Sequence, residues 1–276
     1  MKTAMILFFW LFSGTLFSQE TLIEGSPLGE IQLSNLDLIS LDTRDQIFAS
    51  TTSGDVYLYD QKGKQLNLFS PPRQGRLDQV EASWTVNIFT FSADLQEFRI
   101  LDRFLNPLAE NSFLLNDITL PKAATLGNNN VIWVWDESDL SLKSLDYLRN
   151  IILQTQPLAL LLDSENLSVT EIREFKNRLF VNVPQSGIFI FDNQGNFLQK
   201  VNLQLDQRLC FYKENLLWIE EGRLKMHSLK SQAIFDLGIL PSTAIESVQI
   251  GMEIMVFQEG DLVTIYPLPA GLRELR

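Results

Sequence analysis

The sequence has almost none of the residues that build metal sites and disulfides. Its 276 residues include one cysteine, Cys210, and one histidine, His227. A single cysteine cannot close a disulfide within the chain, and one thiol with one imidazole cannot complete the usual ligand set of a zinc or copper site. No Asp-x-Asp-x-Asp-Gly loop, which would supply oxygen ligands to calcium, occurs either. We therefore expect no metal and no other cofactor.

Basic residues are scarce as well. The chain has 22 Lys+Arg against 34 Asp+Glu, which gives a formal net charge of −12 at pH 7. A nucleic-acid-binding protein needs basic surface to displace counterions from phosphates, so this balance argues against a nucleic-acid partner. The same negative charge should keep the protein in solution and away from anionic lipid.

One strongly apolar run stands at the N-terminus. Lys2 gives it a positive start, residues 4–17 are almost unbroken apolar sequence, and Ser18 and Gln19 follow. The run is shorter than the roughly 20 residues that cross a bilayer, so we interpret residues 1–18 as a signal peptide cleaved after Ser18. An uncleaved anchor is the alternative. We expect a periplasmic or secreted protein with no membrane insertion after cleavage, and the Phe-rich leader resembles those of exported Bacteroidota-type proteins.

A pair of strands recurs along the rest of the chain. Each copy has a short apolar strand with a bulky residue at its centre, followed about a dozen residues later by a second strand that ends in a turn. The bulky residues are Phe48, Phe89, Trp133, Phe180, Trp218 and Met255. The second column, at the turns, is Asp60, Asp102, Asp146, Asp192, Ser228 and Pro267. The period averages about 41 residues, the length of one four-stranded blade of a β-propeller.

A closed ring requires a fourth strand for the last blade. The last copy contains only three strands, so its fourth strand must come from elsewhere, and residues 21–23 and 30–33 can supply it. We predict an all-β domain over residues 19–269, a six-bladed β-propeller of four-stranded antiparallel blades closed by an N-terminal strand. Residues 270–276 form a short tail. A seven-bladed ring and a two-sheet sandwich are the competing architectures.

The period and the turns resemble those of the six-bladed β-propeller superfamily of the NHL or TolB-like kind, over roughly residues 21–269. The resemblance rests on no diagnostic motif. The Ala-x-Asp-x-x-x-Gly-x-x-x-Trp blade signature of quinoproteins is absent, and so is the Ser-x-Asp-x-Gly-x-x-Trp box of sialidase-like propellers. The resemblance therefore implies a fold and no particular activity.

Candidate site residues are those near the central funnel of such a ring. Counting eight residues back from the bulky column places small or polar residues on five inner strands, namely Ser40, Glu81, Thr125, Cys210 and Ser247. Charged residues of this neighbourhood that could line the funnel and bind a ligand are Glu81, Lys122, Glu171, Arg173, Arg208 and Glu246. Phe211 and Tyr212 are aromatic candidates. We assign no catalytic residue.

The function that fits these features is a binding or scaffold propeller of the bacterial cell envelope, monomeric unless complexed, with an envelope protein or a small ligand as its partner. The alternative is a lyase or hydrolase that acts on a glycan or peptide in the funnel. That alternative requires two carboxylates about 5 to 10 Å apart at an open mouth. A plugged channel would instead favour binding at the surface.

Overall fold

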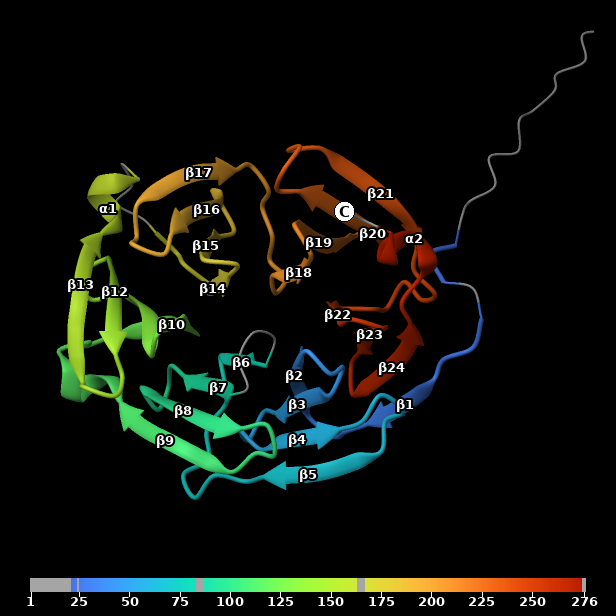
Figure 1. The fold of residues 1–276 in the computed structure, drawn as a ribbon, viewed down its shortest axis with the longest axis horizontal. Helices are drawn as coiled ribbons and strands as arrows, with labels where there is room; N and C mark the ends of the chain where they lie inside the picture. The colour runs from blue at the N-terminus through green and yellow to red at the C-terminus, as the bar shows by residue number, and fades with distance from the viewer. Residues whose placement is uncertain (1–20, 24, 83–86, 163–166, 275–276) are drawn as a thin grey trace, which may run out of the picture.

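The computed structural model describes residues 21–274 except 24, 83–86 and 163–166; the expected leader lies outside the described residues. Within these residues, strands β1 to β24 form six four-stranded antiparallel sheets arranged in a ring (Figure 1). The protein is a six-bladed β-propeller, as the period of the sequence predicts. The seven-bladed ring and the sandwich are wrong.

Each blade has its first strand at the centre of the ring and its last strand at the rim (Figure 1). From blade one to blade six, the inner strands are β2 (Leu36–Leu41), β6 (Gln79–Glu81), β10 (Pro121–Leu126), β14 (Glu171–Phe175), β18 (Cys210–Tyr212) and β22 (Ser247–Ile250). The second strands are β3 (Ile47–Thr51), β7 (Asn87–Ser92), β11 (Val131–Asp136), β15 (Arg178–Val183), β19 (Asn215–Glu220) and β23 (Ile254–Glu259). The third strands are β4 (Val56–Tyr59), β8 (Glu97–Asp102), β12 (Ser141–Asp146), β16 (Gly187–Asp192), β20 (Arg223–Ser228) and β24 (Leu262–Pro267). The outer strands are β5 (Gln65–Phe69), β9 (Pro107–Ser112), β13 (Ile151–Pro157), β17 (Phe197–Val201), β21 (Ile234–Ile239) and, in blade six, β1 (Gly29–Gln32).

The N-terminal strand closes the ring, as predicted. β1 pairs antiparallel with β24, and Ile31 lies opposite Val263. Residues 21–23 do not contribute to this closure, because β1 already occupies the free edge of β24. Thr21 forms a parallel bridge to Ile239 in the outer strand of blade five instead, and Leu22 N–H donates to the same residue's carbonyl oxygen at 3.0 Å.

The apolar core is divided among the blade interfaces. The described residues contain six clusters of buried apolar side chains, and each cluster joins two neighbouring blades, including the last and the first. At the interface of blades three and four, for example, Trp133 and Trp135 pack with Phe189 and Phe191. The second strands are covered on both faces, and the sequences of several of them are nearly continuous apolar runs, as in β11.

Three short helices occur among the described residues, on connections between strands and near the C-terminal end. The 3-10 helix η1 (Phe113–Asn116) follows β9, α1 (Leu158–Leu161) follows β13, and α2 (Ala270–Arg273) follows β24. Leu272 of α2 is buried in the cluster between blades five and six. Of the helices in the described part of the chain, none has the length and apolar character to cross a membrane.

Candidate functional site

A buried ion cluster occupies the centre of the ring, where the inner strands meet. Arg173 of β14 lies between two carboxylates: its Nε is 3.4 Å from Glu81 Oε1, and its Nη2 is 3.3 Å from Glu171 Oε1. All three residues are at most 8% exposed. A guanidinium that is always charged can occupy such a site only because carboxylates accompany it.

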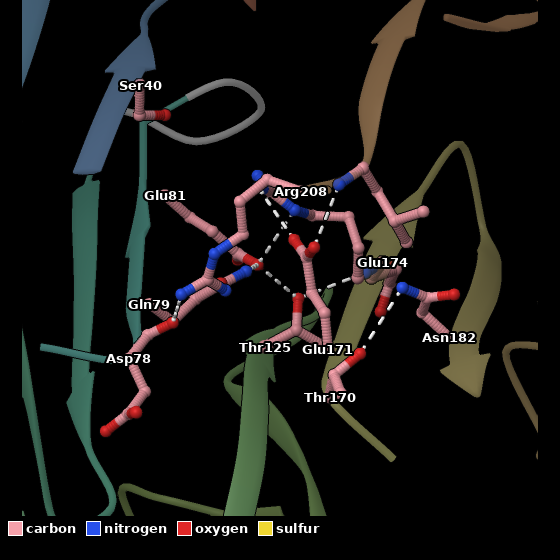
Figure 2. A network of polar contacts seen from close by, with 12 residues as sticks. Ser40, Asp78, Gln79, Glu81, Thr125, Thr170, Glu171, Glu174, Asn182 and Arg208 are labelled. Atoms are coloured by element: carbon pink, nitrogen blue, oxygen red, sulfur yellow. Dashed lines mark hydrogen bonds and ion pairs between the residues drawn. The ribbon is translucent and has the colours of Figure 1, made fainter. Parts of the chain in front are cut away.

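Glu81 is held by further hydrogen bonds from its own blade and from blade three (Figure 2). Gln79 Nε2 donates to its Oε1 at 2.5 Å, Thr125 Oγ1 donates at 2.7 Å, and Leu126 N–H donates to Oε2 at 3.2 Å. Burial raises the pKa of Glu81 above its ordinary value, while the charge of Arg173 and these hydrogen bonds act to lower it. Each oxygen of this carboxylate therefore already has protein partners.

Arg208, which precedes β18 in blade five, reaches across the axis to blade two. Its Nη1 donates to Gln79 Oε1 at 3.0 Å, and its Nη2 donates to the carbonyl oxygen of Asp78. Figure 2 shows Arg208 beside Asp78, Gln79 and Glu81. Glu171 is tied to blade five as well, since Leu209 N–H donates to its Oε2 at 2.8 Å. We call these linked polar residues (Gln79, Glu81, Glu171, Arg173 and Arg208) the axial network.

Two cavities among the described residues lie at opposite ends of the axial network. The larger, about 260 Å³, is lined by residues where the inner strands β2, β14, β18 and β22 end. The smaller, about 60 Å³, is lined where β2, β6 and β22 begin and by Arg208. Arg173 and Gln249 line both cavities. The axial network therefore separates the two ends of the channel.

The larger cavity has mainly apolar walls and a few charged groups. Its apolar and aromatic lining residues are Leu41, Phe175, Leu209, Phe211, Tyr212, Ile250 and Met252. Its charged lining residues are Asp42, Arg173, Lys176 and Lys213. Phe211 stacks on Phe175 with ring centroids 4.5 Å apart. Of this apolar set, the sequence pointed only to Phe211 and Tyr212, because the others lie in ordinary strand ends and turns.

The structure brings four of the six charged candidates into the axial network and leaves two outside. Lys122 is exposed, lies at a register shift in β10, and its Nζ is 3.9 Å from Glu137 Oε2. Glu246 is exposed and precedes β22; its N–H donates to the carbonyl oxygen of Gln258 at 2.8 Å. Neither residue is among those that line the two cavities.

Glu174 is a buried acid that the sequence analysis did not identify. Its backbone N–H donates to Thr125 Oγ1 at 3.0 Å, and its carboxylate accepts from Asn128 Nδ2 at 3.1 Å. Burial, together with the negative charge of Glu81, raises the pKa of Glu174 to about 7. Its position next to the charged candidates Glu171 and Arg173 was the available sequence signal, but nothing there indicated burial.

Cys210 and His227 do not form a reactive site. The Cys210 thiol is 2% exposed, and burial raises its pKa to about 12, so it stays protonated and is a poor nucleophile. His227 is buried in β20, where burial lowers its pKa. No group of three or more His, Cys, Asp or Glu residues that could hold a metal ion occurs among the residues that the structure describes.

No family model and no curated protein matches this chain. Solved propellers do match its fold. The WD40 domain of Pan2 from Neurospora crassa superposes with a TM-score of 0.63 and 9% identity, covering 88% of this chain and 95% of that one. A catalytically inactive virginiamycin B lyase from Staphylococcus aureus, solved with quinupristin, superposes with a TM-score of 0.55 and 12% identity. The match covers 83% of this chain and 79% of the lyase chain.

PorZ of Porphyromonas gingivalis, a bacterial surface component of the type-IX secretion system, is a third structure with this fold. It has a TM-score of 0.56 and 13% identity, and the match covers 85% of this chain and 32% of PorZ. This chain therefore corresponds to about a third of the PorZ chain. Identities this low establish the shared propeller fold and nothing finer.

Proposed function

We propose that this protein is a binding or scaffold propeller that acts outside the cytoplasm of a bacterium and takes a partner protein of the envelope at the face that carries the larger cavity. The observation that carries the proposal is the closed channel. The axial network crosses the ring between blades two, four and five, so ligand access is confined to the ends of the channel. The larger end is apolar, as protein-binding sites are at their centres.

A glycosidase-like activity in the funnel is less well supported by the same geometry. Glu81 and Glu171 are the paired carboxylates of the channel, and both are buried against Arg173. Asp42 is the one carboxylate among the described residues lining the larger cavity, and its Oδ1 accepts from the N–H groups of Arg44 and Gln46. Glycoside hydrolysis needs an acid and a base that face an open site. Glu81, Glu171 and Asp42 do not form such a pair.

The proposal also assigns roles to the charged candidates. Arg173 contributes to the binding face, because it lines the larger cavity. Glu81, Glu171 and Arg208 hold the network beneath that face and keep it rigid. A wall fixed before binding loses less conformational entropy when a partner docks, which favours affinity.

An extracytoplasmic location is supported by the sequence of residues 1–18, which has the charge and apolar pattern of a signal peptide. The fold is compatible with such a location, since PorZ, which is described as a bacterial surface component, has it too. Cell fractionation and intact mass test this part of the proposal. We expect an exported chain that begins at Gln19, and retention of residues 1–18 in the membrane fraction would contradict it.

Site-specific crosslinking tests the binding face. We would place the photoreactive amino acid p-benzoylphenylalanine at Met252, which is 61% exposed at the larger cavity, and at Leu198, which is 51% exposed on the outer strand β17. Irradiation of cells should give a discrete crosslinked envelope protein from position 252 and not from position 198. The same products from both positions, or none from position 252, would overturn the proposal.

A further inference from the structure

We infer that the larger cavity binds an aromatic side chain presented by an acidic segment of the partner protein. This inference rests on the proposed function, because it specifies what the partner places at the binding face.

The size and the walls of the cavity suit an aromatic ring. A cavity of about 150 Å³ lined by apolar side chains can bind benzene, so the cavity of about 260 Å³ has room for a larger ring system such as indole. Phe211 stacks on Phe175 with an interplanar angle of 18° and packs against Phe180 with ring centroids 4.6 Å apart. These contacts fix the aromatic wall in place, so that it offers preformed surface for offset or edge-to-face packing.

The charges around the cavity favour an acidic neighbour of that ring. Arg173, Lys176 and Lys213 line the cavity, whereas the carboxylates that pair with Arg173 are buried beneath it and do not line the wall. The carboxylate of Asp42 is engaged by backbone N–H groups. The cavity lining therefore carries three cations and one carboxylate, on a chain whose net charge is −12. Cations at the cavity attract a partner's carboxylates and repel its basic side chains.

The lysines can reach a docking carboxylate without breaking buried structure. Lys176 Nζ is 2.6 Å from Glu214 Oε1, but both side chains are more than a third exposed. An ion pair so well solvated exchanges partners readily. Lys213 Nζ donates to the carbonyl oxygen of Arg273 at 2.7 Å and lies 5.3 Å from the centroid of the Tyr212 ring. Both ammonium groups thus border aromatic wall residues, where a carboxylate next to a bound ring would arrive.

The smaller cavity does not offer the same site. Its volume of about 60 Å³ is too small for a ring. Arg208 lines the smaller cavity and not the larger one, and its guanidinium already donates to Gln79 and to the carbonyl oxygen of Asp78. The two ends of the channel thus differ in what they can accept.

Peptide titration tests the inference with the purified mature protein. The probes are three acetylated and amidated pentapeptides: Asp-Glu-Trp-Asp-Glu, the same peptide with Ala for Trp, and Lys-Lys-Trp-Lys-Lys. Calorimetry should show the acidic Trp peptide binding at least tenfold more tightly than the other two. Its affinity should fall with added salt, since exposed charges are screened. The methyl NMR signals of Met252 and Leu41 should shift on its addition.

Charge-reversed variants locate the site. Lys176→Glu with Lys213→Glu should weaken the acidic Trp peptide by more than tenfold and improve binding of the Lys peptide. The matched control, Lys62→Glu with Lys230→Glu, makes the same charge change in exposed turns of blades one and five and should stay within twofold of wild type. If the first double variant does not fold, Lys176→Gln alone and the salt dependence of the wild type give the same test.

Three outcomes would overturn the inference. Equal affinity for all three peptides would remove the specificity argued here. Tight binding of free indole-3-acetate, with no gain from a peptide, would identify a small carboxylate as the ligand instead. If crosslinking from Met252 captures an envelope protein but no peptide binds, the chemistry inferred for the segment is wrong while the proposed function stands.

Discussion

Glu81 and Glu174 are two buried acids with different surroundings. Glu81 has the guanidinium of Arg173 and several hydrogen-bond donors, so its charge is compensated within the axial network. Glu174 is 8% exposed, and its carboxylate accepts hydrogen bonds from Asn128 and Trp133, with Glu81 as a charged neighbour of the same sign. Desolvation makes the largest contribution to the raised pKa of both acids, and at Glu174 it brings the pKa to about 7.

The stability of the protein should fall as the pH rises from about 4.5 to about 7. The pKa of Glu174 is about 7 in the folded protein and 4.5 for an unperturbed glutamate, so in this window the folded state holds a proton that the unfolded state has released. Glu174→Gln should flatten this slope. Allowing for partial solvation, we expect an effect of about 1–2 kcal/mol, which is a few degrees in Tm for a domain of this size.

Thermal unfolding of both proteins between pH 5 and pH 8 measures this slope. Glu259→Gln, at an exposed acid in β23, is the matched control and should keep the slope of the wild type. If Glu174→Gln keeps that slope too, Glu174 is not the group responsible.

At the level of elements, the hairpins that lead to the outer strands of blades one, two and four share one turn, whereas the Asp146 turn of blade three bonds differently and blade five has Ser228 in place of the aspartate. Asp102 Oδ1 accepts from Phe104 N–H and Asn106 N–H, and Asp192 Oδ1 accepts in the same way from two residues of its own turn. Leu105 takes the positive φ of the Asp102 turn, with φ 67°, although asparagine adopts this conformation more readily and Asn106 is the next residue. The amide of Asn106 is instead used as a donor to Asp102 Oδ2 at 2.8 Å. The aspartates recur at this position because their side chains accept hydrogen bonds from backbone N–H groups of the same turn.

The closing strand β1 offers a test of the ring in two adjacent residues. Ile31 is 3% exposed and packs in the cluster between blades six and one, whereas Glu30 is exposed on the same strand. We expect Ile31→Ala to lower the free energy of unfolding by about 2–4 kcal/mol, since it deletes buried apolar atoms and leaves a cavity. Glu30→Ala should change it by less than about 0.5 kcal/mol. Urea unfolding measures both.

Removing the whole segment extends the same test. Deletion of residues 19–34 would expose the edge of β24 and open the ring, so we expect aggregation or a large loss of thermal stability. A truncated protein that melts at the wild-type temperature would show that closure contributes little.

At the scale of the whole molecule, the axial network joins blades that are not neighbours. Arg208 of blade five contacts blade two, and Arg173 of blade four pairs with Glu81 of blade two. Contacts across the axis supplement the six interface clusters, which join only adjacent blades. The network therefore resists relative movement of opposite sides of the ring.

Arg173→Met should lower the free energy of unfolding by about 3–5 kcal/mol at pH 7, because it leaves Glu81 buried without its cation. Burial then raises the pKa of Glu81 further, so the loss should shrink as the pH is lowered and the carboxyl takes up a proton. Adding Glu81→Gln to Arg173→Met should restore part of the stability. Arg149→Met, at a side chain that is 74% exposed, is the control and should have little effect. If Arg173→Met and Arg149→Met lower the free energy of unfolding equally, the axial ion cluster does not stabilise the ring.

From the sequence we predict six four-stranded blades, with seven as the alternative, closure of the ring by the N-terminal strand, and the positions of the hairpin turns. These features are local or periodic: strands covered on both faces give apolar runs such as residues 131–135, and the turns of blades one to four each use an aspartate and a residue with positive φ. The number of repeats of about 41 residues in the domain also predicts the number of blades. Such signals lie within one blade and can be read without knowing the neighbouring blade.

Only the tertiary structure decided which side chains meet at the axis. Counting eight residues back from Met255 places Ser247 opposite it, but the tighter hairpin pairs Met255 with Ile250 and Ser247 with Gln258. In blades one to three the same count does give the opposite residue, since Ser40 pairs with Phe48, Glu81 with Phe89 and Thr125 with Trp133. A shift of register by one residue turns a side chain to the other face of the sheet, so a count that holds in these blades does not carry over to every blade. The axial network and the larger cavity join residues of blades far apart in sequence, and their distances are set by how the closed ring brings the inner strands together.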